Sequence, residues 1–247
     1  MLTKKIILLA VLLVPGVCLA AEEGAVPLDS ADTDIHDVAS LQRGARNFVN
    51  YCMGCHTLKY LRWNRMASDL GISEDDLKQY LITDGAKPFA PMTNAMSPKL
   101  AEKWFGKAPP DLSLIARARG TDYLYTFLRS FYADPSRPTG VNNLVLPNAA
   151  MPDVLANLQG VQKPKIELIT KGNKTEKHVV GLEPGTPGSM TPEQFDGFVR
   201  DTVNFLDYAG EPIKATRERL GVWVMLFLLV FWGLTYLLKK EYWKDIK

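Results

Sequence analysis

The most chemically specific feature of this 247-residue sequence is the run Cys52-Met53-Gly54-Cys55-His56, which has the C-x-x-C-H spacing. Two thiols three positions apart on one helical turn can form thioether bonds to the two vinyl groups of one haem. The imidazole that follows them then lies beneath the iron as an axial ligand. The motif therefore predicts one covalently attached haem c, held by Cys52, Cys55 and His56.

Other uses of this motif explain fewer of its residues. A thioredoxin-type redox pair needs a βαβ context and gives His56 no role. A structural zinc site needs further ligands, and the histidines outside the motif are only His36 and His178. A plain disulfide between Cys52 and Cys55 also leaves the histidine unexplained. Haem attachment accounts for all three residues.

A haem site of this kind needs a sixth iron ligand or an open position for a reacting molecule. Candidates by residue type are His36, His178 and several methionines. Met151 differs from the other methionines because Pro152 follows it and the turn-rich stretch 133–150 precedes it. A rigid loop that presents a thioether suits an axial ligand. Met53 lies inside the motif and is expected to face the wrong way. Five further methionines are expected in the core, in loops or in the membrane: Met66, Met92, Met96, Met190 and Met225.

Both ends of the sequence point to a membrane. Residues 1–21 have the lysines, apolar run and small-x-small cleavage site of a secretory signal peptide. Residues 220–238 carry no charge, and as a helix they would extend about 28 Å, close to the hydrocarbon thickness of a bilayer. Lysines after this span favour a cytoplasmic tail, 239–247. The haem domain, 22–219, is then expected in the periplasm of a bacterium, anchored in the inner membrane.

Composition excludes other classes of protein. With 47% hydrophobic and 23% charged residues the chain is typical of globular proteins. A formal net charge of +2 without a basic stripe gives no indication of nucleic-acid binding. The segment 22–219 contains 23 Lys and Arg against 25 Asp and Glu, so the positive balance comes from the membrane-proximal ends.

The elements that must position the haem ligands are mainly helices. Apolar spacing, capping residues and prolines predict them in several places: 41–52, from 73, 98–105, from 109 to 120, 122–132 and 192–209. Long loops are expected at 83–96 and 133–150, and Gly172-Asn173 predicts a small β-hairpin within 165–182. The expected fold class is mainly α, with long loops, one small β-hairpin and one C-terminal transmembrane helix.

Further segments of the sequence resemble the cytochrome c1 family, and the compact length resembles its proteobacterial members. They occur in order over nearly all of 35–245. The segments are Arg43-Gly44-Ala45, Leu58-Lys59-Tyr60, Ala108-Pro109-Pro110-Asp111-Leu112-Ser113, Arg117-Ala118-Arg119, Asn148-Ala149-Ala150-Met151-Pro152 and the capped helix before the anchor. The resemblance implies a class I cytochrome c-like haem domain.

The resemblance also implies roles for the matching residues. His56 and Met151 would ligate the iron. Arg119 would approach a haem propionate with Tyr123 beside it, and two prolines would shape the haem crevice. The complete implied haem-binding set is Cys52, Cys55, His56, Met151, Arg119, Tyr123, Pro109 and Pro110.

The implied activity is one-electron transfer in the respiratory quinol–cytochrome c reductase, the cytochrome bc1 complex. The partners would be the Rieske iron–sulfur protein as donor, a c-type cytochrome as acceptor, and cytochrome b beside the membrane anchor. This subunit would carry out no bond-making chemistry of its own on a substrate. Lysines in 163–177 differ from the acidic stretch of some relatives and argue against a strongly basic acceptor. Two alternatives remain: a membrane-anchored c-type cytochrome serving another reductase, and a haem peroxidase or sensor with an open sixth position.

Overall fold

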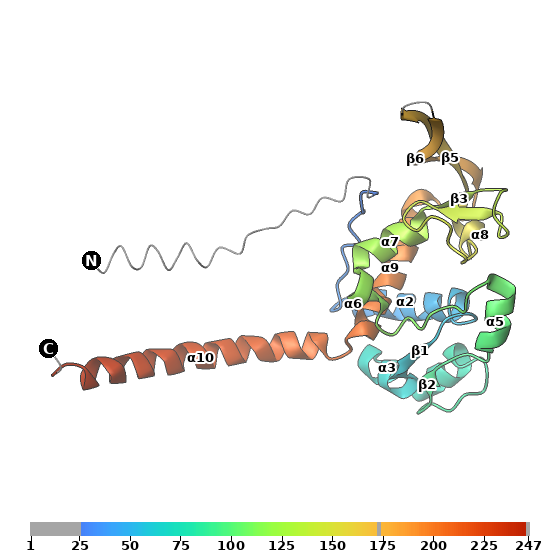
Figure 1. Ribbon diagram of the computed structural model, residues 1–247. Coiled ribbons are helices and arrows are strands. Elements are labelled where there is room, and N and C mark those ends of the chain that lie inside the picture. The colour runs from blue at the N-terminus through green and yellow to red at the C-terminus, as the bar shows by residue number, and fades with distance from the viewer. Residues whose placement is uncertain (1–25, 172–173, 246–247) are drawn as a thin grey trace.

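The computed structural model describes residues 26–171 and 174–245, and the predicted signal peptide, 1–21, lies outside them. A helical domain carries a long helix that extends away from it (Figure 1). The helical elements are α2 (Val38–Tyr51), α3 (Trp63–Leu70), α4 (Glu74–Asp76), a π-helical turn η1 (Leu77–Leu81), α5 (Pro98–Phe105), α6 (Ile115–Arg119), α7 (Thr121–Arg129), α8 (Ala156–Gln159), α9 (Pro192–Gly210) and α10 (Lys214–Tyr242). The predicted fold class, mainly α with an apolar C-terminal helix, is confirmed.

The strands form small antiparallel pairs. They are β1 (Leu58–Arg62) with β2 (Pro91–Met92), β3 (Phe131–Ala133) with β4 (Val141–Asn143), and β5 (Gly160–Lys171) with β6 (Lys174–Pro187). The paired strands β5 and β6 confirm the predicted hairpin within 165–182 and make it longer than expected, while its predicted turn residues Gly172-Asn173 lie outside the described residues. Register shifts after Val161 and Lys165 interrupt its alternation of side chains, so the sequence pattern shows only its central part. The loop expected at 83–96 contributes the short strand β2.

The core of the domain is centred on the packing of α2 against α9. Phe48 and Phe205 meet there with ring centroids 5.8 Å apart. The two helices approach closely because Gly44 has no side chain: a Cβ at this position would collide with the carbonyl oxygen of Asp201. The helix that leads into the haem motif is therefore fixed against the longest helix of the domain.

Local capping sets the start of α9 as the sequence predicts. The backbone N–H of Thr191 donates to Gln194 Oε1 at 2.9 Å, and the Gln194 N–H donates to Thr191 Oγ1 at 3.3 Å. This reciprocal capping box satisfies two helix N-terminal donors, and Pro192 follows in the first turn. At α4, the Ser73 hydroxyl accepts from the Asp76 N–H at 3.1 Å in the same way.

The prediction of a helix that begins at Pro109 is wrong. Residues 109–112 have no regular secondary structure, and α6 begins only at Ile115. The cause is tertiary: the Leu112 N–H donates to the carbonyl of Thr57 at 2.8 Å, and the Asp111 carboxylate is also bonded to that distant segment. These bonds replace the local capping that a Pro-Pro-Asp start would provide.

The long helix α10 contains the predicted anchor 220–238. Among the described residues it is the one helix long and apolar enough to cross a membrane, and none of its apolar window is buried. Its first turns form ion pairs with the domain, including Arg217 Nε to Glu211 Oε1 at 3.0 Å and Lys214 Nζ to Asp207 Oδ2 at 3.0 Å. The membrane helix thus starts from a base that is bonded to α9.

Candidate haem site

The haem motif forms one turn at the end of α2. Cys52 caps this helix, and the N–H groups of Cys55 and His56 both donate to its carbonyl, at 3.1 and 2.8 Å. Both cysteines are half-buried free thiols. Burial, and next the neighbouring Cys55, raise the pKa of Cys52 to about 12, so this thiol is protonated at neutral pH. The turn therefore places two free thiols and an imidazole beside one another.

The imidazole of His56 is held by a backbone carbonyl. Its Nδ1 lies 2.8 Å from the Pro110 oxygen, and because a carbonyl can only accept, Nδ1 carries the proton. Burial lowers the pKa of His56, although the bond to Pro110 and the charge of Asp111 oppose this. The ring is then neutral with its Nε2 lone pair uncommitted. This is the state in which a histidine binds iron, with its other nitrogen oriented by a second partner.

Asp111 fixes the segment that supplies this carbonyl. One carboxylate oxygen accepts from Thr57 Oγ1 at 2.6 Å and from the Lys59 N–H at 2.9 Å, and the other accepts from the Ser113 N–H at 3.0 Å. Burial by itself raises the pKa of Asp111, but these hydrogen bonds outweigh it and lower the pKa. Pro110, one of the two predicted crevice prolines, is thereby held beside the haem motif, and Pro109 precedes it in the chain.

Replacing Asp111 by Ala is expected to lower the free energy of unfolding by about 1–3 kcal/mol, because it leaves the donors of Thr57, Lys59 and Ser113 without their acceptor. Urea unfolding of the haem-bearing protein measures this loss. The control is Asp84→Ala, since Asp84 is exposed and accepts one backbone bond, from Ala86. Equal losses for the two variants would contradict a special role for Asp111.

Asn94 joins the loop before α5 to the haem motif. Its Nδ2 donates to the carbonyls of Met53 at 2.9 Å and His56 at 3.2 Å. No local pattern singles out Asn94, because its partners lie 41 and 38 positions earlier in the chain. These two bonds tie the loop before α5 to the backbone of the motif.

Arg119 and Tyr123 lie together, as the resemblance implies. Arg119 ends α6, and its guanidinium carbon is 5.4 Å from the centre of the Tyr123 ring. Tyr123 in turn stacks on Phe127, with centroids 6.2 Å apart. Within the described part of the chain, these contacts link the two residues to α7 and not to the haem motif. Their contact with a haem propionate stays a prediction.

Met151 lies in an irregular segment between β4 and α8. Its side chain is half-buried, and Asn148 before it has a left-handed backbone with φ of 65°. Two other methionines, Met66 and Met92, are completely buried in the core. The bond between Met151 and the iron stays a prediction.

The residues of this site suit a covalent haem. Two free thiols stand one turn apart, and the adjacent imidazole has its Nε2 available while Nδ1 is bonded to Pro110. In the described part of the chain, no cluster of three or more His, Cys, Asp or Glu side chains is arranged to hold a metal ion. The zinc interpretation therefore gains no support.

Comparison with known proteins agrees with this site. The family described as Cytochrome C1 matches residues 30–246 of the chain. The chain belongs to the cytochrome c1 family. Cytochrome c1 of Allochromatium vinosum is 49% identical over 245 residues, which cover 98% of this chain and 99% of that protein.

Two further relatives extend the comparison. A protein of Nitrosomonas europaea named ammonia monooxygenase gamma subunit is also 49% identical, over 249 residues and 98% of both chains. A Candida albicans protein named as a subunit of the mitochondrial cytochrome b-c1 complex is 26% identical over 236 residues, covering 85% of this chain and 73% of that protein.

Membership in the cytochrome c1 family confirms several predictions at once. Proteins of this family are electron-transfer haem subunits of a respiratory membrane complex and carry one covalently bound haem c. The proteobacterial resemblance, the fold class and the cofactor are thus confirmed, and a single C-terminal membrane anchor fits both the family and α10.

Proposed function

We propose that this cytochrome c1 passes single electrons from the Rieske iron–sulfur protein to a c-type cytochrome within the quinol–cytochrome c reductase complex. Cys52 and Cys55 would hold the haem, and His56 and Met151 would be its axial ligands. The observation that carries the proposal is the state of His56: its Nδ1 proton is bonded to Pro110 at 2.8 Å while Nε2 is uncommitted beside two free thiols.

The reaction requires little of the protein besides binding and orientation. Haem, when bound, supplies an iron that accepts and releases one electron. The Pro110 carbonyl keeps the His56 ring in one tautomer. Met151 would be the second protein ligand of the iron, and its thioether would exclude other molecules and raise the reduction potential. No group is transferred, so the site needs no general acid or base.

The proposed orientation places the haem domain, 22–219, in the periplasm and the tail, 239–247, in the cytoplasm. The signal peptide 1–21 and the lysines that follow the anchor 220–238 support it. Large apolar side chains are exposed along α10, with Trp223 68% and Phe227 66% exposed in the isolated chain. Lipid and the helices of cytochrome b are the proposed cover for these side chains.

The charges on the surface of the haem domain indicate what charge its acceptor cytochrome has. Lys163 and Lys165 are exposed on β5, next to Glu167. Mixed charges of this kind do not create the strong negative field that steers a highly basic partner. We therefore propose an acceptor cytochrome of modest charge.

A second candidate is a membrane-anchored cytochrome that serves a different enzyme. The observation in its favour is the name of the Nitrosomonas relative, which assigns that protein, also 49% identical to this chain, to an ammonia monooxygenase. Its haem site would be unchanged, so only the partners distinguish the two candidates.

Mild-detergent purification of the full-length chain from its own membrane tests the proposed function. We expect b-type haem and a Rieske centre to copurify with the haem c, and quinol to reduce this haem within the purified complex. If the haem c purifies with neither b-type haem nor a Rieske centre, the result would contradict the proposal and favour the second candidate. A high-spin haem that reacts with peroxide would instead indicate an open sixth position.

A further inference from the structure

The segment that carries Met151 has little regular structure of its own. It runs from the end of β4 at Asn143 to the start of α8 at Ala156. It has few hydrogen bonds between backbone groups: the Leu144 N–H donates to the Ser130 carbonyl, and the Ala149 N–H donates to the Leu146 carbonyl. A loop that must hold a sulfur atom in one place therefore depends on side chains for its rigidity.

Asn143 supplies the first part of that support. It is completely buried, and its Oδ1 accepts from the N–H groups of Val145 at 2.9 Å and Leu146 at 3.0 Å. Its Nδ2 donates to the Phe127 carbonyl at 2.8 Å, near the end of α7. One side chain thus accepts from two N–H groups in the first turn of the loop and also bonds that turn to α7.

Asn142 supplies the second part, nearer to Met151. Its Oδ1 accepts from the Asn148 N–H at 2.8 Å, and its Nδ2 donates to Asp134 Oδ2 at 2.9 Å. On the other side of the same residue, the Asn148 carbonyl accepts from Arg137 Nη2 at 3.3 Å. Asn148 is therefore held at both its N–H and its carbonyl, in a left-handed conformation with φ of 65° that asparagine tolerates better than most residues.

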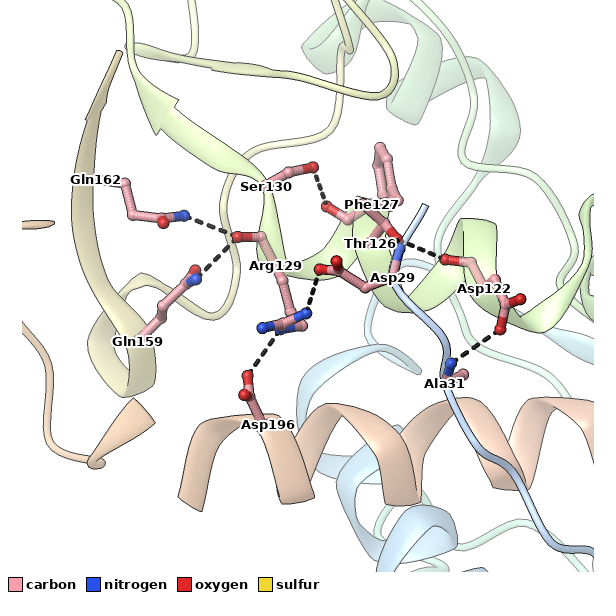
Figure 2. Close-up of polar contacts among 10 residues, drawn as sticks. All are labelled: Asp29, Ala31, Asp122, Thr126, Phe127, Arg129, Ser130, Gln159, Gln162 and Asp196. Atoms are coloured by element: carbon pink, nitrogen blue, oxygen red, sulfur yellow. Dashed lines mark hydrogen bonds and ion pairs between the residues drawn. The ribbon is translucent and has the colours of Figure 1, made fainter. Parts of the chain in front are cut away.

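The helix to which this loop is tied is itself firmly anchored. Figure 2 shows Arg129 at the end of α7, with Nε 2.7 Å from Asp196 on α9 and Nη1 2.6 Å from Asp29 of the N-terminal segment. The Arg129 carbonyl also accepts from the side chains of Gln159 and Gln162, at 2.9 and 2.8 Å. The end of α7 is thus bonded to α9, the N-terminal segment, α8 and β5.

We propose that Asn142 and Asn143 are positioning residues that hold the loop 144–150, Asn143 by its bond to α7 and Asn142 by its bond to Asp134, and so fix the Met151 thioether as the sixth ligand of the iron. This inference rests on the proposed function, because it requires Met151 to be that ligand. The asparagines act through the loop and do not contact the cofactor. Without them the loop samples other conformations, and the sulfur occupies its ligating position for a smaller fraction of the time.

The test compares Asn143→Ala and the milder Asn142→Ala with Asn204→Ala in the full-length haem-bearing protein. Asn204 of α9 is a matched control because it is only 1% exposed. Its Nδ2 donates to the Asp34 carbonyl at 2.7 Å and to Ser40 Oγ at 3.0 Å, away from the Met151 loop. The readouts are the ferric thioether–iron band, carbon monoxide binding to the ferrous protein, and hydrogen exchange of the amides in 144–150.

We expect Asn143→Ala to lose most of the thioether band, to bind carbon monoxide that the wild type excludes, and to exchange the Val145 and Leu146 amides about tenfold faster or more. Asn142→Ala should show smaller changes in the same direction. Asn204→Ala should keep all three wild-type properties, even if it unfolds at a lower urea concentration.

Met151→Leu separates the two levels of the proposal. If it abolishes the band while both Asn142→Ala and Asn143→Ala keep the band and exclude carbon monoxide, the positioning role is wrong and the ligand assignment stands. Equal effects in Asn204→Ala would also overturn the positioning role, because they would reflect general instability. If Met151→Leu keeps the band, the proposed ligand is wrong, and the positioning role fails with it.

Discussion

Met151→Leu is expected to retain the covalent haem but to lose the ferric thioether–iron band and much of the reduction potential. Attachment uses Cys52, Cys55 and His56, which the substitution leaves intact. Leucine has a similar volume, so the packing loss should stay below about 1.5 kcal/mol. The soft sulfur ligand, which favours ferrous over ferric iron, is removed.

The fall in potential should be on the order of 100 mV or more, within the range of about 0.8 V over which axial ligands tune haem. For a one-electron couple, about 59 mV changes the equilibrium constant tenfold. Electron transfer from the Rieske centre would therefore become unfavourable, and quinol-driven turnover should collapse while quinol binding persists. A spectroelectrochemical titration of the purified complex measures the change.

Met92→Leu is the matched control for this substitution. Met92 is completely buried in β2, so the same change of side chain tests packing without ligation. We expect its spectrum and potential to stay near those of the wild type. Loss of the thioether band in Met92→Leu, with retention of the band in Met151→Leu, would show that the ligand is assigned to the wrong methionine.

Gly44→Ala is expected to destabilise the domain by about 3 kcal/mol or more, at the upper end of the cost of overpacking a core. The new methyl group would collide with the Asp201 carbonyl and press on Cβ of Phe205, 2.7 Å away. Because rigid helix backbone forms part of the obstacle, α2 and α9 must separate. Thermal or urea unfolding measures the effect, and haem incorporation should fall with it.

Gly197→Ala provides the control on the same pair of helices. Gly197 lies within α9, and a Cβ there would meet no atom within 4 Å. Replacing an unobstructed helix glycine by alanine is expected to raise stability by up to about 1 kcal/mol. Opposite signs for the two substitutions would establish the close approach of α2 and α9, whereas equal small effects would contradict it.

The sequence predicts well those features that depend on neighbouring residues. The haem motif is contained in five consecutive positions, and the capping box of Thr191 and Gln194 is contained in four. Both are found where the spacing places them. The hairpin is predicted for the same reason, although its bulges hide its full length.

Features that depend on distant partners could not be predicted in this way. The Pro110 carbonyl that orients His56 is 54 positions away along the chain. The false helix at Pro109 has the same origin, since bonds from Asp111 to the segment after the motif override its local preference for a helix start. In the sequence, Asn142 and Asn143 are two polar residues of a turn-rich stretch. Only the fold shows that both bond the Met151 loop, and that Asn142 also bonds Asp134 and Asn143 also bonds α7.

The most direct measurement is the optical spectrum of the full-length protein in its purified complex, recorded in the ferric and ferrous states and after acid extraction of non-covalent haem. One haem c per chain should remain after extraction, with a low-spin ferric spectrum, a weak thioether–iron band and complete reduction by quinol. A ferric spectrum that is high-spin, or a haem that acid extraction removes, would contradict a covalent His56/Met151-ligated electron relay.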